Sequence, residues 1–191
     1  MTTRQTLAPA LLSGLLLSTT PVLAAQLNAP AVVQEIQAAH ASETELKAFD
    51  QVKVPITIAI SAAAKHASGS KVIDASFDAG NGTPVYKVKT YQSNSVWEGI
   101  VDAQSGRIVG LGTTTRESQL DQEDKAELTG LQHATTTLAQ AVDAAERRGA
   151  GNAIRAGLEE TNGKIVYEIL VVKNGSTQKV VIDPKTGQIA G

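Results

Sequence analysis

An internal repeat with an offset of about 80 residues organises most of this chain. Val85-Tyr86-Lys87-Val88 recurs as Val166-Tyr167-Glu168-Ile169, Asn81-Gly82 recurs as Asn162-Gly163, and residues 102–110 recur as residues 183–191. Residues 57–59 recur at 137–139, one position out of step, so the second copy carries one extra residue near Gly151. Matches in one order at one spacing indicate a duplicated structural unit. We therefore expect two tandem modules, at residues 55–112 and 135–191.

Each copy begins with a segment that favours a helix. Residues 58–67 and 138–147 are rich in alanine, and apolar side chains of the second segment recur at the spacing of one helix face. Thr57 and Thr137 precede these segments and suit the N-cap, because a hydroxyl can accept a hydrogen bond from a free N–H group of the first turn. Gly69 and Gly149 suit the left-handed conformation that ends many helices.

The remainder of each copy has the pattern of antiparallel strands. Apolar and polar side chains alternate over residues 73–78 and 154–159, as in strands with one buried face. Asn-Gly pairs at 81–82, 162–163 and 174–175 favour two-residue hairpin turns, and residues 92–95 hold the matching place in the first copy. Further strands are expected at 85–91, 96–102 and 107–109, and at 165–173, 177–183 and 188–190. Asp102 and Asp183 begin Asp-x-x-x-Gly turns, which an aspartate side chain can cap.

The fold class expected from these patterns is α+β. Each module is one helix packed on a three- to four-stranded antiparallel sheet. Alanine on the buried face of the helix lets it approach the sheet closely. This packing needs few large rings, and the chain has only six aromatic residues.

Two segments outside the copies are expected to be helical. Residues 28–51, within an N-terminal segment 26–54, carry apolar side chains at helical spacing, with a possible break at 40–42. Residues 116–132, within a linker 113–134, are strongly charged and space Leu120, Leu128 and Leu131 for a helix. A solvated linker is the alternative for this second segment.

Residues 1–25 have the features of a signal peptide. Arg4 is followed by an apolar stretch over residues 7–17 and by small residues up to Ala24 and Ala25, where cleavage is expected. The apolar stretch is shorter than the roughly 20 residues that cross a bilayer, which argues against a membrane anchor. We expect an exported protein, periplasmic or secreted, with no stable membrane anchor after cleavage.

Composition excludes several chemistries. The chain has no cysteine, so it has no disulfides and no thiolate chemistry, and a net charge of −2 gives no footprint for nucleic acid. His40, His66 and His133 lie in different segments without the spacing of metal ligands. The acidic pair at 159–160 is expected at a solvated approach to a turn, because adjacent strand positions face opposite sides. We therefore expect no catalytic residue, no metal site and no cofactor.

With these motifs, each copy resembles a PepSY domain. The resemblance rests on the alanine-rich helix, the Asn-Gly turn, the Val-Tyr-x-Val strand and the closing Val/Ile-Asp-x-x-x-Gly-x-Ile, and it covers about 60% of the chain. PepSY domains occur in propeptides of secreted metallopeptidases and as separate exported proteins, and they are regarded as inhibitory or regulatory modules rather than enzymes. The resemblance implies peptidase regulation by a separate chain, since no His-Glu-x-x-His sequence is present.

The resulting hypothesis is a non-catalytic module that binds a protein partner, an extracytoplasmic peptidase, through a sheet edge or a surface, and so inhibits or regulates it. The alternative is a small-molecule or envelope-ligand module that uses the seam between the two copies. Trp97 and Tyr91 are the candidate partner-binding residues, because the second copy has Gln178 and Val172 in their places. The oligomeric state stays open. The residues expected to shape the repeat itself are Asn81, Gly82, Tyr86, Asp102, Gly106, Asn162, Gly163, Tyr167, Asp183 and Gly187.

Overall fold

The computed structural model describes residues 41–80 and 82–190. The expected signal peptide, the first part of the N-terminal helical segment, Asn81 and Gly191 lie outside the described residues. The helices are α2 (Glu43–Phe49), α3 (Ile56–His66), α4 (Gln122–Gln132) and α5 (Leu138–Gly149), with a 3₁₀ turn at Glu117–Gln119. The strands are β1 (Lys71–Asp78), β2 (Val85–Gln92), β3 (Ser95–Asp102), β4 (Ile108–Arg116), β5 (Asn152–Thr161), β6 (Lys164–Lys173) and β7 (Ser176–Ile182).

The two copies share one antiparallel sheet. Its strand order is β4-β3-β2-β1-β5-β6-β7, so the first strands of the two copies pair with each other at the centre. In this junction Asp74 lies opposite Gly157, Ala75 opposite Ala156 and Ser76 opposite Arg155. The α+β class, with one helix on an antiparallel sheet in each copy, is confirmed. The fusion of the two sheets was not part of the sequence prediction.

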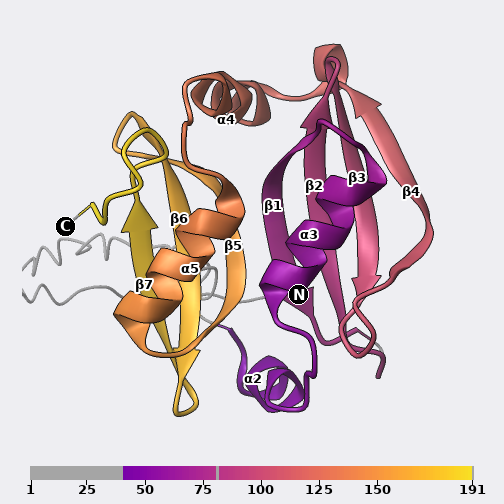
Figure 1. The fold of residues 1–191 in the computed structure, drawn as a ribbon, viewed down its shortest axis with the longest axis vertical. Coiled ribbons are helices and arrows are strands. Elements are labelled where there is room, and N and C mark those ends of the chain that lie inside the picture. Colours follow the sequence, from indigo (N-terminus) through magenta and orange to yellow (C-terminus); the bar gives the residue numbers. More distant parts are fainter. Residues whose placement is uncertain (1–40, 81, 191) are drawn as a thin grey trace, which may run out of the picture.

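Helices α3 and α5 lie side by side on the same face of the sheet (Figure 1). Ala59 and Ala63 of α3 and Ala141 and Ala145 of α5 are completely buried. Because these positions carry only a methyl group, both helices can approach the strands closely. The buried side chains of both copies belong to one hydrophobic cluster, so the two repeats fold around a common core.

The repeated tyrosine holds the start of each helix in place. Tyr86 donates a hydrogen bond to the carbonyl of Val54 at 2.7 Å, and Tyr167 donates one to the carbonyl of Thr136 at 2.9 Å. Both accepting carbonyls lie two residues before the helix begins. Burial raises the pKa of both phenols, that of Tyr167 to about 12. The Val-Tyr motif therefore joins the second strand of each copy to the segment that enters its helix.

The hairpin turns have the conformation that the sequence indicates. Asn162 and Gly163 both have positive φ, 53° and 73°, and Asn174 and Gly175 have 51° and 72°, as a type I′ turn requires. Ser93 and Asn94 adopt the same conformation in the first copy.

The two Asp-x-x-x-Gly turns are capped by their aspartates. The Asp102 carboxylate accepts hydrogen bonds from the Ser105 side chain and from the backbone N–H groups of Ser105 and Gln104, and Asp183 accepts from Thr186 and Lys185. These bonds, led by the Ser105 side chain at Asp102 and the Thr186 N–H at Asp183, hold the pKa of both carboxyls below their usual value.

Three helix ends differ from the sequence prediction. Helix α3 begins at Ile56 after Pro55, so Thr57 lies in its first turn and is not the N-cap, whereas Thr137 does cap α5 by accepting from the Gln140 N–H. Pro55 is the N-cap of α3, with an extended backbone (φ −66°, ψ 154°), and its carbonyl accepts a hydrogen bond from the Ile58 N–H at 3.0 Å, so the first turn closes before Thr57 can serve as a cap. Gly149 is the last residue of α5, and the left-handed position falls to Ala150. Helix α3 ends at His66 with Ala67 as its C-cap, and Gly69, which does have a positive φ of 86°, follows two residues later.

The connection between the copies is partly strand. Strand β4 was expected at residues 107–109 but continues to Arg116, because residues 113–116 pair with residues 95–98 of β3. The expected linker helix begins later, at Gln122, with Asp121 as its N-cap. Figure 1 shows α4 lying across one end of the sheet, between the two halves.

Candidate functional site

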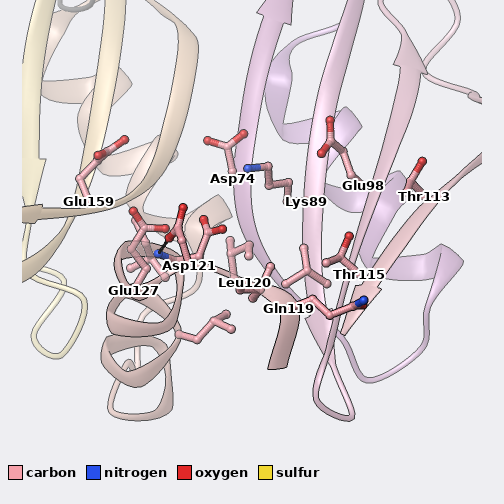
Figure 2. Close-up of a pocket in the computed structure, with 15 residues that line it drawn as sticks. Asp74, Lys89, Glu98, Thr113, Thr115, Gln119, Leu120, Asp121, Glu127 and Glu159 are labelled. Carbon is pink, nitrogen blue, oxygen red and sulfur yellow. Dashed lines mark hydrogen bonds between the residues drawn. The ribbon is translucent and has the colours of Figure 1, made fainter. Parts of the chain in front are cut away.

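A cleft of about 620 Å³ lies on the sheet face opposite α3 and α5. Its floor is formed by β1, β2 and β3, and one wall is formed by α4 (Figure 2). We call it the open-face cleft. Its lining residues are Ile73, Asp74, Lys89, Val96, Glu98, Thr113, Thr115, Gln119, Leu120, Asp121, Asp124, Glu127, Leu128, Leu158 and Glu159.

Strand pairing places a row of charged side chains across the floor. Asp74 lies opposite Lys89, Lys89 opposite Glu98, and Glu98 opposite Thr113. These side chains share one face because directly paired residues project to the same side of a sheet. Figure 2 shows Lys89 between the two acids. The row therefore alternates negative, positive and negative charge over three adjacent strands.

Asp74 is the most perturbed carboxyl group in this row. It follows a bulge in β1 between Val72 and Asp74 and is partly buried. Burial raises its pKa to about 6, although Lys89 and Arg155 act in the opposite direction, and Glu159 and Glu98 add to the rise. Perturbed carboxyl pKa values of this kind cluster at functional sites.

Gly157 provides the space that Asp74 occupies. A Cβ atom on Gly157 would lie 2.7 Å from Oδ2 of Asp74. Because Gly157 belongs to β5 and Asp74 to β1, the carboxyl sits at the junction of the two copies. Neither copy alone forms this environment.

The wall and rim of the cleft are acidic. Asp121 caps α4 by accepting a hydrogen bond from the Asp124 N–H at 2.9 Å, which places these acids at the cleft. In total six acidic side chains and one lysine line the cleft. Such a surface has a negative potential and attracts cationic groups.

A metal site has no support in the described part of the chain. No group of three or more His, Cys, Asp or Glu side chains among residues 41–80 and 82–190 converges to hold an ion. His66 packs against Trp97 and His133 follows α4, while His40 lies outside the described residues.

Trp97 lies on the helix face of the sheet, away from the open-face cleft. Its ring packs against His66 with a centroid distance of 4.6 Å, and its Nε1 donates to the carbonyl of Leu111 at 3.1 Å. Cβ atoms on Gly99 or Gly112 would lie 1.9 and 2.5 Å from Trp97 atoms, so the ring lies directly on both glycines. Trp97 is thus partly buried against the core, and its role in partner binding stays a prediction.

Tyr91 lies on the opposite face from Trp97. It pairs with Val96, whereas Trp97 pairs with the buried Thr90. Its hydroxyl donates to the Glu117 carboxylate at 2.6 Å, and this bond raises the pKa of Tyr91. The structure therefore does not bring the two predicted partner-binding residues together.

A second hollow lies on the helix side of the junction. It has about 440 Å³ between α3 and α5 and is lined mainly by apolar atoms, among them those of Ile60, Ala64, Leu138 and Tyr167. We call it the helix-side groove. Ser70 also lines it, and its buried Oγ has no hydrogen-bond partner among the described residues.

Sequence reasoning did not find the open-face cleft. Glu159 and Glu160 are both exposed, as expected of a solvated turn approach, and Glu159 in addition lines the cleft. The polar positions of the strands did contain a signal, since Asp74, Lys89 and Glu98 all fall on the polar side of the alternation. Their meeting depends on the register of three strands and on the β1–β5 pairing, which no local pattern specifies.

This architecture defines a duplicated α+β module with a polar cleft on its exposed sheet face. The family model described as "Peptidase propeptide and YPEB domain", PepSY, matches residues 53–111 and 136–191. The chain belongs to the PepSY family, with two copies of the domain. Domains of this family are generally non-catalytic, extracytoplasmic modules associated with peptidases.

The other comparisons add little to this assignment. No curated protein matches the chain. Among solved structures, a protein of Clostridium difficile 630 described as a candidate lipoprotein is similar, with 22% identity and a TM-score of 0.42, over 74% of this chain and 93% of that one. A likeness of this degree carries no information about function. In the described part of the chain, no helix has the length and apolar character to span a membrane.

Proposed function

We propose that this chain is an exported, non-catalytic binding module that regulates an extracytoplasmic peptidase. Its open-face cleft holds a basic segment of that partner. The association of PepSY domains with peptidases supports the class of partner, and the signal-like residues 1–25 support export. The proposed mode is surface binding, in which the bound module covers the active site of the peptidase and keeps substrate out.

One observation carries the proposal, namely the ionisable Asp74 in the floor of a cleft rich in carboxylates. An ionised carboxylate in this partly buried position opposes folding, because burial disfavours its charged form. Groups that oppose folding in this way are concentrated at functional sites, where stability is traded for activity. A lysine or arginine side chain entering the cleft would add a positive charge beside Asp74 and Glu98.

Charge reversal in the cleft tests this function. The mature protein, immobilised, is exposed to the exported proteins of the parental cell, and cleavage of casein by that fraction is measured with and without free protein. We expect retention of a peptidase and a fall in casein cleavage. Glu98→Lys should weaken both effects by about tenfold or more, because it places a repulsive charge beside Lys89.

Asp143→Lys is the matched control, since Asp143 is an exposed acid on α5, on the other side of the sheet. It should behave as the wild type. The proposal fails if no peptidase is retained and casein cleavage is unchanged, or if Glu98→Lys and Asp143→Lys have equal effects.

The helix-side groove supports a second candidate function, the binding of a small apolar molecule with one polar group. The observation in its favour is Ser70, whose Oγ is buried beside the groove without a partner among the described residues, because a buried hydroxyl normally has one. A ligand oxygen could accept its hydrogen bond.

Native mass spectrometry of the protein purified from its own cell tests this candidate. We expect a bound small molecule in the wild type and its loss in Ala64→Phe, which fills the groove from α3. Ser70→Ala should weaken retention by about three- to tenfold, the value of one hydrogen bond. An unliganded wild-type mass in every preparation would eliminate this function.

A further inference from the structure

One edge of the sheet, strand β7, is only partly paired on its outer side. Its inner side pairs with β6 along its whole length. On its outer side, Ile182 forms a bridge with Ile189, and the carbonyl of Val181 accepts from the Ala190 N–H at 2.9 Å. Among residues 41–80 and 82–190, none pairs with the outer side of residues 176–180.

In the first copy, the strand equivalent to β7 is paired along its outer side. Ile108 pairs with Val101 there, as Ile189 does with Ile182, but β4 then continues and pairs Thr113–Arg116 with residues 95–98 of β3. The repeat offset of 81 maps residues 95–98 onto residues 176–179 of β7. The same backbone that is paired in the first copy is therefore unpaired in the second, within the described residues.

The orientation of the open backbone groups follows from the hydrogen bond between Val181 and Ala190. The Val181 carbonyl points outward, because it bonds residue 190. Backbone groups of alternate residues in a strand point to the same side, so the N–H and C=O groups of Lys179 and Thr177 also point outward. Those of Gln178 and Val180 point to β6.

We propose that this edge of β7 binds an extended segment of the partner protein, in the place that Thr113–Arg116 occupies in the first copy. The proposal rests on the proposed function, since it names a second contact with the same partner. The added strand forms backbone hydrogen bonds with Thr177 and Lys179. Threonines occupy the corresponding strand in the first copy, so β-branched residues fit the position.

A second copy of this chain fits the edge less well. If β7 of a second copy paired with β7 of the first, only the same short stretch of each strand could pair, because residues 188–190 cover the end of each β7. Its β4 is interrupted where Gly110 and Gly112 have positive φ and Leu111 projects, 92% exposed.

A proline substitution tests the outward backbone groups of β7 separately from its side chains. Thr177→Pro removes an outward N–H group, and proline is tolerated on edge strands in that position. Thr177→Ala, the matched control, removes the side chain and keeps the N–H group. In the peptidase capture described above, we expect Thr177→Pro to reduce binding by at least about fivefold, the value of one lost hydrogen bond, and Thr177→Ala to leave it unchanged.

A tail added to the chain provides an internal probe that does not require the partner. The sequence of residues 111–116, Leu-Gly-Thr-Thr-Thr-Arg, is appended after Gly191, which corresponds to Gly110. Tethering gives it a millimolar effective concentration at the edge. We expect amide hydrogen exchange at Thr177 and Lys179 to slow by about tenfold or more relative to the unextended protein, and capture of the peptidase to fall. The tail combined with Thr177→Pro should not protect Lys179.

The outcomes distinguish the edge from the cleft. The inference is overturned if the tail gives no protection, if Thr177→Pro captures the peptidase as well as Thr177→Ala, or if both amides are already protected in the free wild type. Dimerisation of the wild type that Thr177→Pro abolishes would assign the edge to a second copy and overturn it too. Loss of capture in Glu98→Lys but not in Thr177→Pro would leave the proposed function standing alone.

Discussion

Replacing Tyr167 with alanine is expected to lower the free energy of unfolding by about 3–5 kcal/mol, and to destabilise both copies together. Tyr167 is 1% exposed, and its hydroxyl donates a hydrogen bond to the carbonyl of Thr136, in the segment that enters α5. The shared sheet and the common buried cluster couple the second copy to the first. Trp97, the only tryptophan, reports on the first copy. Its fluorescence in urea should therefore shift to a lower midpoint, together with the far-ultraviolet circular dichroism.

Tyr167→Phe is the control for this effect. It keeps the ring and removes only the hydrogen bond to Thr136, so a loss of about 1 kcal/mol is expected. Independent copies would give a different result for Tyr167→Ala. The Trp97 transition would stay at its wild-type midpoint while circular dichroism showed a separate, earlier transition. That pattern would contradict the coupling inferred from the β1–β5 junction.

Asp74→Asn is expected to stabilise the protein by about 2–3 kcal/mol at pH 7.5. The folded state raises the pKa of Asp74 from 3.8 to about 6, so ionisation of this group opposes folding above that pH. In the wild type, the contribution of Asp74 is most favourable below pH 4 and is lost as the pH rises through 6. The stability difference between Asp74→Asn and wild type should therefore be largest above pH 7 and shrink towards zero near pH 4, as measured by urea unfolding at each pH.

Asp78→Asn, on the same strand, should change the stability in the opposite direction and destabilise the protein. Its carboxylate forms an ion pair with Lys87 at 2.5 Å, and hydrogen bonding to that side chain lowers its pKa. The pair stabilises the folded protein above the unfolded pKa and loses its effect on acidification. Asp78→Asn should therefore cost under about 1 kcal/mol at pH 7.5, since the pair is exposed. Equal pH profiles for Asp74→Asn and Asp78→Asn would refute the assignment at Asp74.

For these two aspartates, the sequence pattern predicts the strand face but not the environment of each carboxyl group. Alternation placed Asp74 and Asp78 together on the polar side of one strand, and the structure agrees. Their environments are nevertheless opposite, because Asp78 lies at the strand end beside Lys87 whereas Asp74 lies against β5 and opposite Gly157. The difference arises from a strand that is about 80 residues away in sequence.

The errors at the helix ends have a local cause. Thr57 and Thr137 are equivalent in the repeat, but only Thr137 caps its helix. Pro55, which has no equivalent in the second copy, is the N-cap of α3, and its carbonyl accepts from the Ile58 N–H, so α3 begins at Ile56. Comparison of the copies therefore identified the helix and misplaced its first turn.

The sequence by itself determined the duplication, the order of helix and strands in each copy, and the hairpin turns at Asn162-Gly163 and Asn174-Gly175. These features depend on periodicity and on backbone preferences of neighbouring residues, which act within one segment. Only the tertiary structure decided that β1 and β5 join the copies into one sheet, that Asp74, Lys89 and Glu98 form a row, and that β7 keeps an open stretch. Strand partners and register depend on contacts between distant segments. The pairing of one copy with the other is therefore not visible in the residue pattern of either copy.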